Sequence, residues 1–473
     1  MSDTRSPGIT ETVARFACGR SHPTEDRVAA ATRSLVDVVG VALAGRETPA
    51  FRAVSRWADS EPTTGTSVVW GAGIRRGAAQ AALLNGTAGH ALDFDDACPS
   101  MPLHPSTVLW PALLAVVRDD GTEPDPTSVS QALDVGNAVL RAIGEALPMA
   151  THYERGWHST STVGRLAAVA ALARLRGLDM TTTRHALGVV ASMAAGSLAN
   201  FGTATKPLHA GLAARDAVVA VSLAEHGLDA APDQLEHRSG FLALFGAPDR
   251  TAGERLGERL EHWERDWPHD WSLKRYPSCY GTHRSLDAVL ELREEIDPAE
   301  VESVEVWAGR RSLRPLLRRL PTSGLEAKFS LHYTVATTLL RGAPGITDFT
   351  DAALADPTVR DLMRRVHVHG EDTPPDRPDL AGQPYALVRV RLTGGATAQR
   401  LVLHTRGDAR NPLTDAEIDD KFRAAAGAGG YAKDATETLL ALLRRALVEP
   451  GALAGALAAL RDNDSRSERH SSE

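Results

Sequence analysis

The sequence predicts a mainly α fold, in which an all-helical domain carries a smaller α+β domain. From the N-terminus to about residue 265, apolar residues recur at steps of three and four, which is the spacing of helices with a buried face. After Trp271 this spacing gives way to stretches in which apolar and polar residues partly alternate, as they do in half-buried strands. The chain of 473 residues also exceeds the roughly 250–300 residues at which a single hydrophobic core stops growing.

Residues 1–268 are predicted to form the first part of the helical domain. Thr24, followed by two acids, has the pattern of an N-cap, and the helix that it starts continues to Gly45. Several later helices are so rich in alanine and valine that both of their faces are expected to be buried. The remaining predicted helices lie at about 76–92, 106–118, 127–146, 160–176, 182–199 and 208–226.

Residues 269–405 are predicted to form the α+β domain. The segment 301–306 partly alternates valine with polar residues, which favours a strand. Residues 385–404 have the pattern of two strands around Gly394-Gly395, a strong signal for a hairpin. Helices are predicted at about 283–295, 324–341 and 350–365.

Residues 406–460 are predicted to be helical again and to return to the first domain. Thr414 is expected to cap the helix that follows it, and a further helix is expected over 434–447. The last residues, 461–473, are polar and lack core residues, so they are expected to be a disordered tail.

Composition and charge indicate which partners and which compartment to expect. The net charge of −8 is spread along the chain without a long basic block, so nucleic acid is not an expected partner. No run of about 18 apolar residues is present, so a membrane is not expected either. The first twenty residues carry acids and lack an apolar stretch, and the three cysteines are widely spaced. These features predict a cytoplasmic protein in a reducing compartment, without a structural zinc site.

The segment GHALDFDDACPSMPLHPSTV gathers acids and histidines where one predicted helix ends and the next begins. It contains His90, Asp93, Asp95, Asp96 and His104. N-capping and solvation of the helix ends would explain some of these residues. A magnesium site, or the acidic proton donor of a class II terpene cyclase, would explain the Asp-x-Asp-Asp pattern but not the second histidine.

Two further segments place single polar residues beside apolar helices. His158 precedes a helix start, a position that favours neutral imidazole and hence a general base. Lys206 lies among small residues immediately before an apolar helix, where a lone cation is unusual unless it meets an anion. The alternatives are a packed surface histidine and a lysine whose stem lies along the apolar surface. Gly202 and Gly211 would allow close approach of the backbone.

The last two segments belong to the predicted α+β domain. LKRYPSCYGTHRSLDA holds Lys274, Arg275 and Cys279 near the predicted domain junction, and clefts between domains commonly bind small ligands. EAKFSLHYTVATTLL places Tyr333 on an otherwise apolar helix. The alternative for this residue is a core tyrosine whose hydroxyl is satisfied.

In this order and at these separations, the segments resemble the MmgE/PrpD family, which includes 2-methylcitrate dehydratase, cis-aconitate decarboxylase and iminodisuccinate epimerase. The elements that carry the resemblance are ALDFDD, HPS, GWH, K-P-x-H-A-G, K-x-Y-P, F-S-x-x-Y and the closing GDARNPLTDAEIDDKF. They span about residues 8–448 and are specific only jointly. The resemblance implies that the smaller domain is a lid, that the enzyme is a homodimer with its site between the domains, and that it needs no metal or organic cofactor.

The family's functional residues carry over onto positions of this chain. The resemblance implies that Asp93 and His104 are the acid and histidine of the first motif, His158 the second histidine, Lys206 the substrate lysine, Lys274 the lid lysine and Tyr333 the lid tyrosine.

One departure bears on the reaction. Cys279 stands where the cis-aconitate decarboxylases carry a histidine shortly after the lid lysine, which favours other reactions over decarboxylation. In an epimerase, which needs two opposed acid/base groups, Cys279 could face His158.

The expected chemistry is proton transfer on a small di- or tricarboxylate such as 2-methylcitrate. Lys206, Lys274, Arg275 and His104 are predicted to bind the substrate, while a neutral His158 removes a proton next to a carboxylate. His104 with Asp93 is predicted to relay protons. Dehydration by a hydro-lyase is the leading hypothesis, an epimerase or isomerase and a decarboxylase are the alternatives, and a non-catalytic binding protein descended from such enzymes is a further one.

Overall fold

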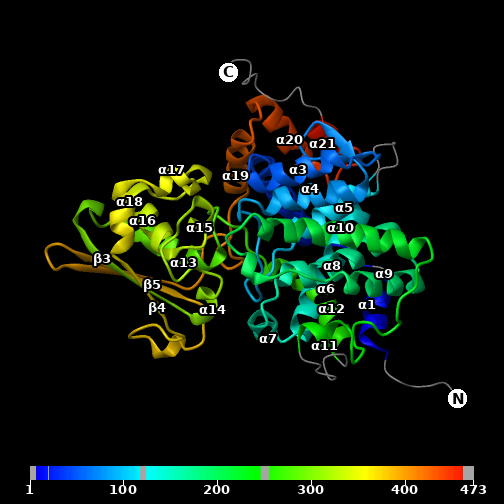
Figure 1. Ribbon diagram of the computed structural model, residues 1–473, viewed down its shortest axis with the longest axis horizontal. Coiled ribbons are helices and arrows are strands. Elements are labelled where there is room, and N and C mark those ends of the chain that lie inside the picture. Colours follow the sequence, from blue (N-terminus) through cyan, green and yellow to red (C-terminus); the bar gives the residue numbers. More distant parts are fainter. Residues whose placement is uncertain (1–6, 20, 118–123, 247–254, 462–473) are drawn as a thin grey trace.

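The computed structural model describes residues 7–19, 21–117, 124–246 and 255–461, and it is mainly helical. Two lobes lie side by side, a larger helical lobe built from both ends of the chain and a smaller lobe around a four-stranded sheet (Figure 1). The predicted fold class is therefore confirmed. The exact domain boundaries stay a prediction, and the predicted tail lies outside the described residues except for Arg461, which ends the last helix.

Among the residues that the structure describes, the helical lobe begins with twelve α-helices and one short hairpin. The hairpin pairs β1 (Ser67–Val69) with β2 (Ile74–Arg76). The helices are α1 (Ile9–Cys18), α2 (Glu25–Gly45), α3 (Pro49–Ser60), α4 (Ala78–His90), α5 (Ser106–Ala115), α6 (Pro126–Ala146), α7 (Met149–Glu154), α8 (Ser159–Arg176), α9 (Met180–Ser192), α10 (Thr205–Glu225), α11 (Phe241–Phe245) and α12 (Leu256–Asp266).

The helix α2 lies at the centre of this lobe. Among the helices described, it is the one that is long and apolar enough, by length and composition, to cross a membrane. However, 83% of its most apolar stretch is buried inside the protein, against neighbours that include α4 and α19. Its composition is that of a core helix surrounded by other helices.

The end of the described chain packs in the helical lobe. It forms α19 (Asp415–Ala428), α20 (Lys433–Arg445) and α21 (Ala452–Arg461). Thr414 caps α19 in a reciprocal capping box with Glu417. The helix packs so closely on α2 that a Cβ atom at Gly40 would lie 2.7 Å from the Phe422 ring, so glycine is required there.

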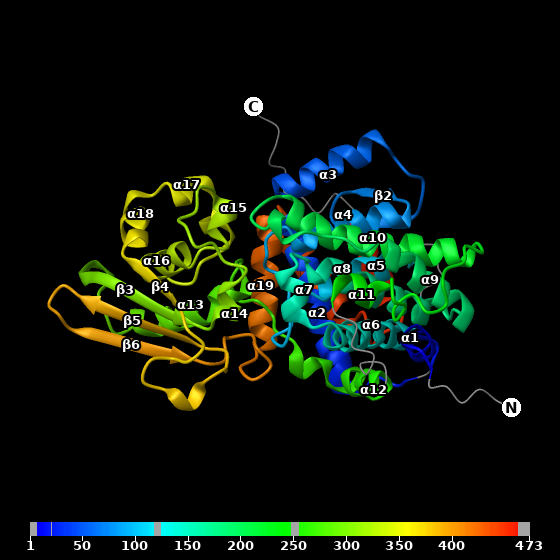
Figure 2. The same ribbon diagram turned by 60° about the horizontal axis from the view of Figure 1, so that its bottom comes forward.

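The smaller lobe is the α+β lid. Its sheet has the order β4-β3-β5-β6, with β3 parallel to β4 and antiparallel to β5, and with β5 and β6 forming the predicted hairpin. Helices including α13 and α16 lie over the sheet and share its hydrophobic core (Figure 2). The elements are α13 (Tyr280–Arg293), β3 (Val301–Ala308), α14 (Arg310–Leu313), α15 (Gly324–Ala327), α16 (Leu331–Arg341), α17 (Asp351–Leu354), α18 (Pro357–Arg364), β4 (Val366–Gly370), β5 (Ala386–Leu392) and β6 (Thr397–Val402).

The prediction of two long helices in the lid is wrong, because each of them is divided into two shorter helices. The predicted helix 324–341 is divided because the Ser330 hydroxyl accepts a hydrogen bond from the Tyr333 amide and caps a new helix. The predicted helix 350–365 is divided at Pro357, which starts α18 behind its cap Asp356.

Candidate active site

Two closely packed helices bring the first site residues together. The end of α4 carries His90, and the start of α10 carries Lys206. The helices cross at two glycines: a Cβ atom at Gly211 would lie 2.3 Å from the Leu83 carbonyl oxygen, and one at Gly86 would lie 2.8 Å from the Gly211 Cα atom. The predicted close approach at Gly211 is thereby confirmed, and it places the Lys206 Nζ atom 2.9 Å from His90 Nε2.

Asp93 is the centre of charge in the site. Its Oδ1 atom accepts hydrogen bonds from Lys206 Nζ at 2.8 Å and from Lys274 Nζ at 2.9 Å, and its carbonyl oxygen accepts another from Lys274. Burial favours the neutral carboxyl, but the two ammonium groups outweigh it and hold the pKa of Asp93 well below its usual range. Two cations share one carboxylate, so this part of the site is suited to an anionic ligand.

The backbone of Asp93 adopts a left-handed conformation, with φ of 52°. This conformation is uncommon for residues other than glycine and is found more often for aspartate and asparagine. The side chain is buried, and its Oδ2 atom has no hydrogen-bond partner in the protein. A buried acceptor that lacks a partner is unfavourable unless a ligand or water satisfies it.

His90 is a neutral imidazole whose tautomer follows from its partners. The Lys206 ammonium can only donate, so His90 Nε2 must accept and the ring proton must lie on Nδ1. Nδ1 then donates to Asp95 Oδ2 at 2.8 Å. Burial lowers the pKa of His90, and Lys206 lowers it further against the opposing effect of Asp95.

His104 presents an unprotonated nitrogen to the cavity. Its Nδ1 atom lies 2.7 Å from the Asp96 carbonyl oxygen, which can only accept, so the proton lies on Nδ1 and Nε2 is the free acceptor. Burial and then the Lys274 charge hold the pKa of His104 well below its usual range. The imidazole is therefore a base in the resting protein.

His158 is the second imidazole on the cavity wall. It lies at the N-cap position of α8, and its Nδ1 atom is 3.1 Å from Nδ1 of His209. Burial, followed by the charge of Lys206, holds the pKa of His158 well below its usual range. The ring of Phe201 packs edge-to-face with the imidazole, with 5.0 Å between the ring centroids.

The lid contributes a thiol and buried lysines. Cys279 is 8% exposed, and burial followed by the charge of Asp93 raises the pKa of its thiol to about 11, so the thiol is protonated at neutral pH. Lys328 donates to the carbonyl oxygens of Leu92 and Pro277, at 2.9 and 2.8 Å. Burial lowers the pKa of Lys328 to about 7.

Five of the predicted residues share one cavity of about 630 Å³ between the lobes. Lid residues, including Arg284 and Phe329, complete its wall. The five predicted residues on the wall are Asp93, His104, His158, Lys206 and Cys279.

The structure places three predicted residues elsewhere. Lys274 is fully buried behind Asp93 and is not part of the cavity wall, so it is positioned to hold Asp93 rather than substrate. Arg275 is exposed, stacks on the Tyr276 ring and does not line the cavity, so its contact with substrate stays a prediction. Tyr333 lies in the lid core, where its hydroxyl donates to the Asp348 carbonyl oxygen, and it does not line the cavity.

Several site residues were missed by reasoning from sequence. His90 lies in the first motif and His209 in the K-P-x-H-A-G element, so both were visible without an assigned role. Tyr153, on α7, lines the cavity close enough for the charge of Asp93 to influence its pKa. Nothing in the local pattern around Tyr153 or Lys328 indicated that either would reach the site.

Two of the residues that could hold a metal ion, His90 and Asp95, are already joined by a hydrogen bond. Within the described chain, donor atoms of His90, Asp95 and His104 lie within 4.8 Å of one another. Both nitrogens of His90 are engaged, and the Lys206 ammonium at 2.9 Å would repel a second cation. These contacts form a hydrogen-bond network that fixes the tautomer of His90.

Comparisons with known proteins agree on one family. The model of the MmgE/PrpD N-terminal domain matches residues 11–252, and the model of the MmgE/PrpD C-terminal domain matches residues 276–444. The two matches together include residues of both lobes, which form the walls of the cavity.

Curated relatives match nearly the whole chain. A cis-aconitate decarboxylase of Mus musculus is 29% identical over 448 residues, covering 92% of this chain and 90% of the relative. Its counterpart from Homo sapiens is 29% identical over 426 residues, covering 88% and 87%. A cis-aconitate decarboxylase of Aspergillus terreus is 25% identical over 413 residues, covering 83% and 84%.

Proposed function

Because the chain belongs to the MmgE/PrpD family of enzymes that act on polycarboxylates, we propose that it is a hydro-lyase that removes water from a hydroxylated tricarboxylate of the 2-methylcitrate kind. One observation carries the proposal. The neutral imidazoles of His104 and His158 share a cavity with the Lys206 ammonium and the protonated thiol of Cys279. The cavity therefore holds a base, an acid and a cation for a carboxylate.

The first half of the reaction is removal of a proton from the carbon next to a carboxylate. Lys206 binds that carboxylate and stabilises the charge that develops on it. Nε2 of His158 takes the proton, because Nδ1 of the same ring is directed to His209. The electron pair of the broken C–H bond is delocalised onto the bound carboxylate.

The second half is departure of the hydroxyl group. The electron pair forms the carbon–carbon double bond as the C–O bond breaks. The thiol of Cys279 gives its proton to the leaving oxygen, and water departs. The thiolate regains a proton from the His158 imidazolium, so the enzyme returns to its starting state and the net products are an unsaturated acid and water.

Decarboxylation is the second candidate, favoured by the printed names of the relatives. In this reaction a cis-aconitate-like acid loses one carboxylate as CO2. The electron pair of the broken carbon–carbon bond forms a new double bond, and the pair of the existing double bond moves to the carbon next to another carboxylate. That carbon takes the proton of Cys279, and the thiolate regains a proton from solvent water. The homodimer and the cytoplasmic location expected from the sequence stay predictions.

The test is proton NMR of the purified protein in D2O with 2-methylcitrate, citrate, cis-aconitate and iminodisuccinate in separate samples. The proposal expects water loss from a hydroxylated acid, or its reversal, to be abolished in Lys206→Ala and His158→Gln. Tyr333→Phe is the matched control, because this residue lies in the lid core and outside the cavity. It should retain the activity.

The other outcomes assign a different reaction. Conversion of cis-aconitate into an acid with one carboxylate fewer, without water loss from any hydroxylated acid, would replace the hydro-lyase by a decarboxylase. Deuterium that enters next to a carboxylate without net conversion, and that depends on Cys279, would replace it by an epimerase.

A further inference from the structure

Arg284 is a buried cation on the lid wall of the cavity. It lies on α13, one helical turn after Tyr280, and both residues line the cavity. Arg284 is 6% exposed, so its side chain is largely removed from bulk water. Arginine is seldom buried to this extent unless it is paired. The partners of Arg284 therefore indicate what the residue does.

These partners leave most of the guanidinium group unused. The Nε atom donates to the Leu403 carbonyl oxygen at 2.8 Å, and the guanidinium carbon lies 5.8 Å from the centroid of the Tyr280 ring. Among the residues that the structure describes, neither Nη atom of Arg284 forms a hydrogen bond, and no carboxylate forms an ion pair with it. A buried charge without a counter-ion is unfavourable unless a ligand supplies one.

The acid that interacts with Arg284 over a longer distance is already engaged. Burial would raise the pKa of Asp408, but hydrogen bonds from Arg410 lower it, and the charge of Arg284 adds to this effect. Arg410 pairs with Asp408 at 2.9 Å, and the Tyr280 hydroxyl donates to the same carboxylate at 3.4 Å. Asp408 therefore does not neutralise Arg284 in a direct ion pair.

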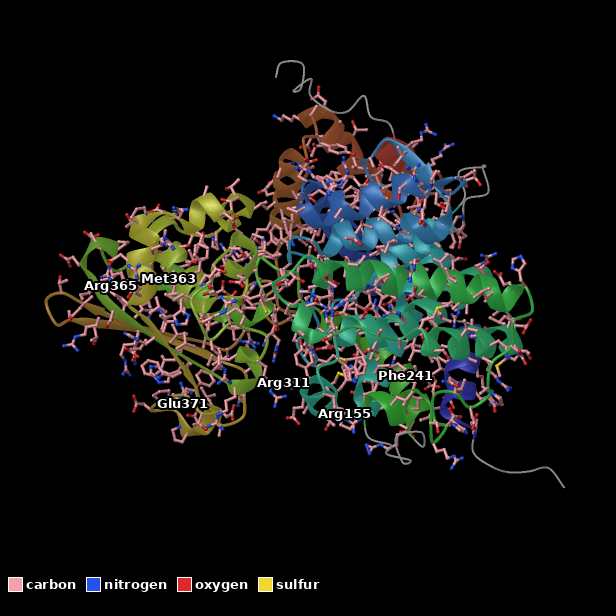
Figure 3. The ribbon with its side chains drawn as sticks, in the orientation of Figure 1. Arg155, Phe241, Arg311, Met363, Arg365 and Glu371 are labelled. Atoms are coloured by element: carbon pink, nitrogen blue, oxygen red, sulfur yellow. The ribbon has the colours of Figure 1, made fainter. Side chains whose placement is uncertain are left out.

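A second arginine on the lid wall differs from Arg284 in its exposure. Figure 3 shows Arg311 at the edge of the lid that faces the helical lobe, where it donates to the Ser100 carbonyl oxygen. Arg311 is exposed, so solvent and salt screen its charge. The charge of Arg284 is screened much less because the residue is buried. Of the two, Arg284 is the stronger site for an anion.

We propose that Arg284 is a second anion-binding residue of the cavity, and that it holds one carboxylate of a substrate whose other carboxylate is bound by Lys206. This inference rests on the proposed function, because it takes Lys206 to bind the first carboxylate. A guanidinium and a carboxylate can form two parallel hydrogen bonds, and the Nη atoms of Arg284 are available for them. The substrate is thus held by both lobes at once.

The position of Arg284 also relates the substrate to the proposed acid. Cys279 is the N-cap residue of α13, and Arg284 lies in the second turn of the same helix. A carboxylate held by Arg284 is therefore fixed relative to the thiol of Cys279. An acid with a single carboxylate lacks one of the two contacts, so Arg284 selects substrates that carry at least two.

The experiment is titration calorimetry with straight-chain dicarboxylic acids from succinate to pimelate, and with the monomethyl ester of each. None of these compounds carries a hydroxyl group, so none can be dehydrated. Each ester is nearly as large as its parent acid but has only one carboxylate. For the acid that reaches both cations, the ester should bind about 10- to 100-fold more weakly, because it loses the hydrogen bonds between two charged groups.

Variants of two arginines on α13 assign this difference. In Arg284→Gln the acid and its ester should bind with nearly the same Kd, while Arg284→Lys, which keeps the charge but not the paired geometry, should retain part of the difference. Arg293→Gln is the matched control and should retain all of it. Arg293 also donates through Nε to a carbonyl oxygen, that of Leu339 at 2.9 Å, but it is exposed and outside the cavity wall.

The outcomes separate this inference from the proposed function. If the difference between acid and ester is lost in Lys206→Ala and unchanged in Arg284→Gln, the inference is overturned and the proposed function stands. An equal loss of affinity for acid and ester in Arg284→Gln would also overturn it, because a structural role has that effect. Equal binding of acids and esters by the unmodified protein would exclude a second carboxylate site. If no compound binds, the site at Lys206 fails, and both proposals fail with it.

Discussion

The helical lobe and the lid form opposite walls of one cavity and contribute different things to it. The helical wall supplies Asp93, His104, His158 and Lys206, which are held by buried partners and fixed tautomers. On the lid wall, Cys279 and Tyr280 carry transferable protons, while Arg311 and Arg314 are exposed and bind the other lobe. The difference indicates that the helical lobe holds the bases and the carboxylate-binding cation in a buried network, while the lid supplies the acid that the proposed reaction needs.

The largest expected effect is on stability, from Asp93→Asn. Asparagine tolerates the left-handed backbone, so the change removes the charge and leaves Lys206 and Lys274 without a counter-ion. Breaking a buried ion pair in this way costs about 3–5 kcal/mol. Urea unfolding at pH 7 should show that loss in the free energy of unfolding, and adding Lys274→Met to the variant should recover part of it. A loss no greater than that of a surface substitution would contradict the role of Asp93.

The next effect is on catalysis, from Lys206→Met. Removal of a group that stabilises developing charge costs about 10²–10³-fold in kcat. Steady-state turnover of the substrate identified by NMR should show it. Lys433→Met, at an exposed position on α20, is the matched control and should be unchanged. A kcat for Lys206→Met within tenfold of the unmodified protein would remove Lys206 from the mechanism.

A smaller effect is expected in the lid core, from Tyr333→Phe. The change removes the hydroxyl that donates to Asp348 and should lower the free energy of unfolding by about 1 kcal/mol. Turnover should stay within twofold, because the residue does not reach the cavity. Thermal unfolding and turnover measured on the same sample check both statements. A loss of activity comparable to that of Lys206→Met would return Tyr333 to the active site.

The smallest effect is expected at the mouth, from Arg314→Gln. Its ion pair with Glu154 is exposed, and such pairs contribute at most about 1 kcal/mol. KM should rise no more than about threefold, and the rise should disappear at high salt because exposed charges are screened. A large change in kcat, or one that persists in salt, would show that the lid does more than close the cavity.

Much of the fold and of the site could be predicted from local pattern. The helical spacing, the caps such as Thr414 and the glycine pair of the hairpin were read correctly because they depend on neighbours in the chain. The motifs also identified Asp93 and Lys206, which meet across 113 residues of sequence. The sequence pattern could not predict that Lys274 lies buried behind Asp93, or that Tyr333 lies in the lid core. Both positions depend on packing between elements that are distant in the sequence.

The most direct test of the account is the charge state of the imidazoles that face the cavity. Nitrogen-15 NMR of the histidine rings, assigned with His104→Gln and His158→Gln, measures it as the pH is lowered. Both pKa values lie well below the usual range, so both rings should remain neutral at pH 6, where an ordinary histidine with a pKa of about 6.5 is mostly charged. The rings would then stay neutral bases at that pH, while the free energy of unfolding falls as the pH is lowered through about 6.5, because the unfolded histidines take up protons that the buried rings do not. A positive charge on either ring at pH 7 would contradict the account.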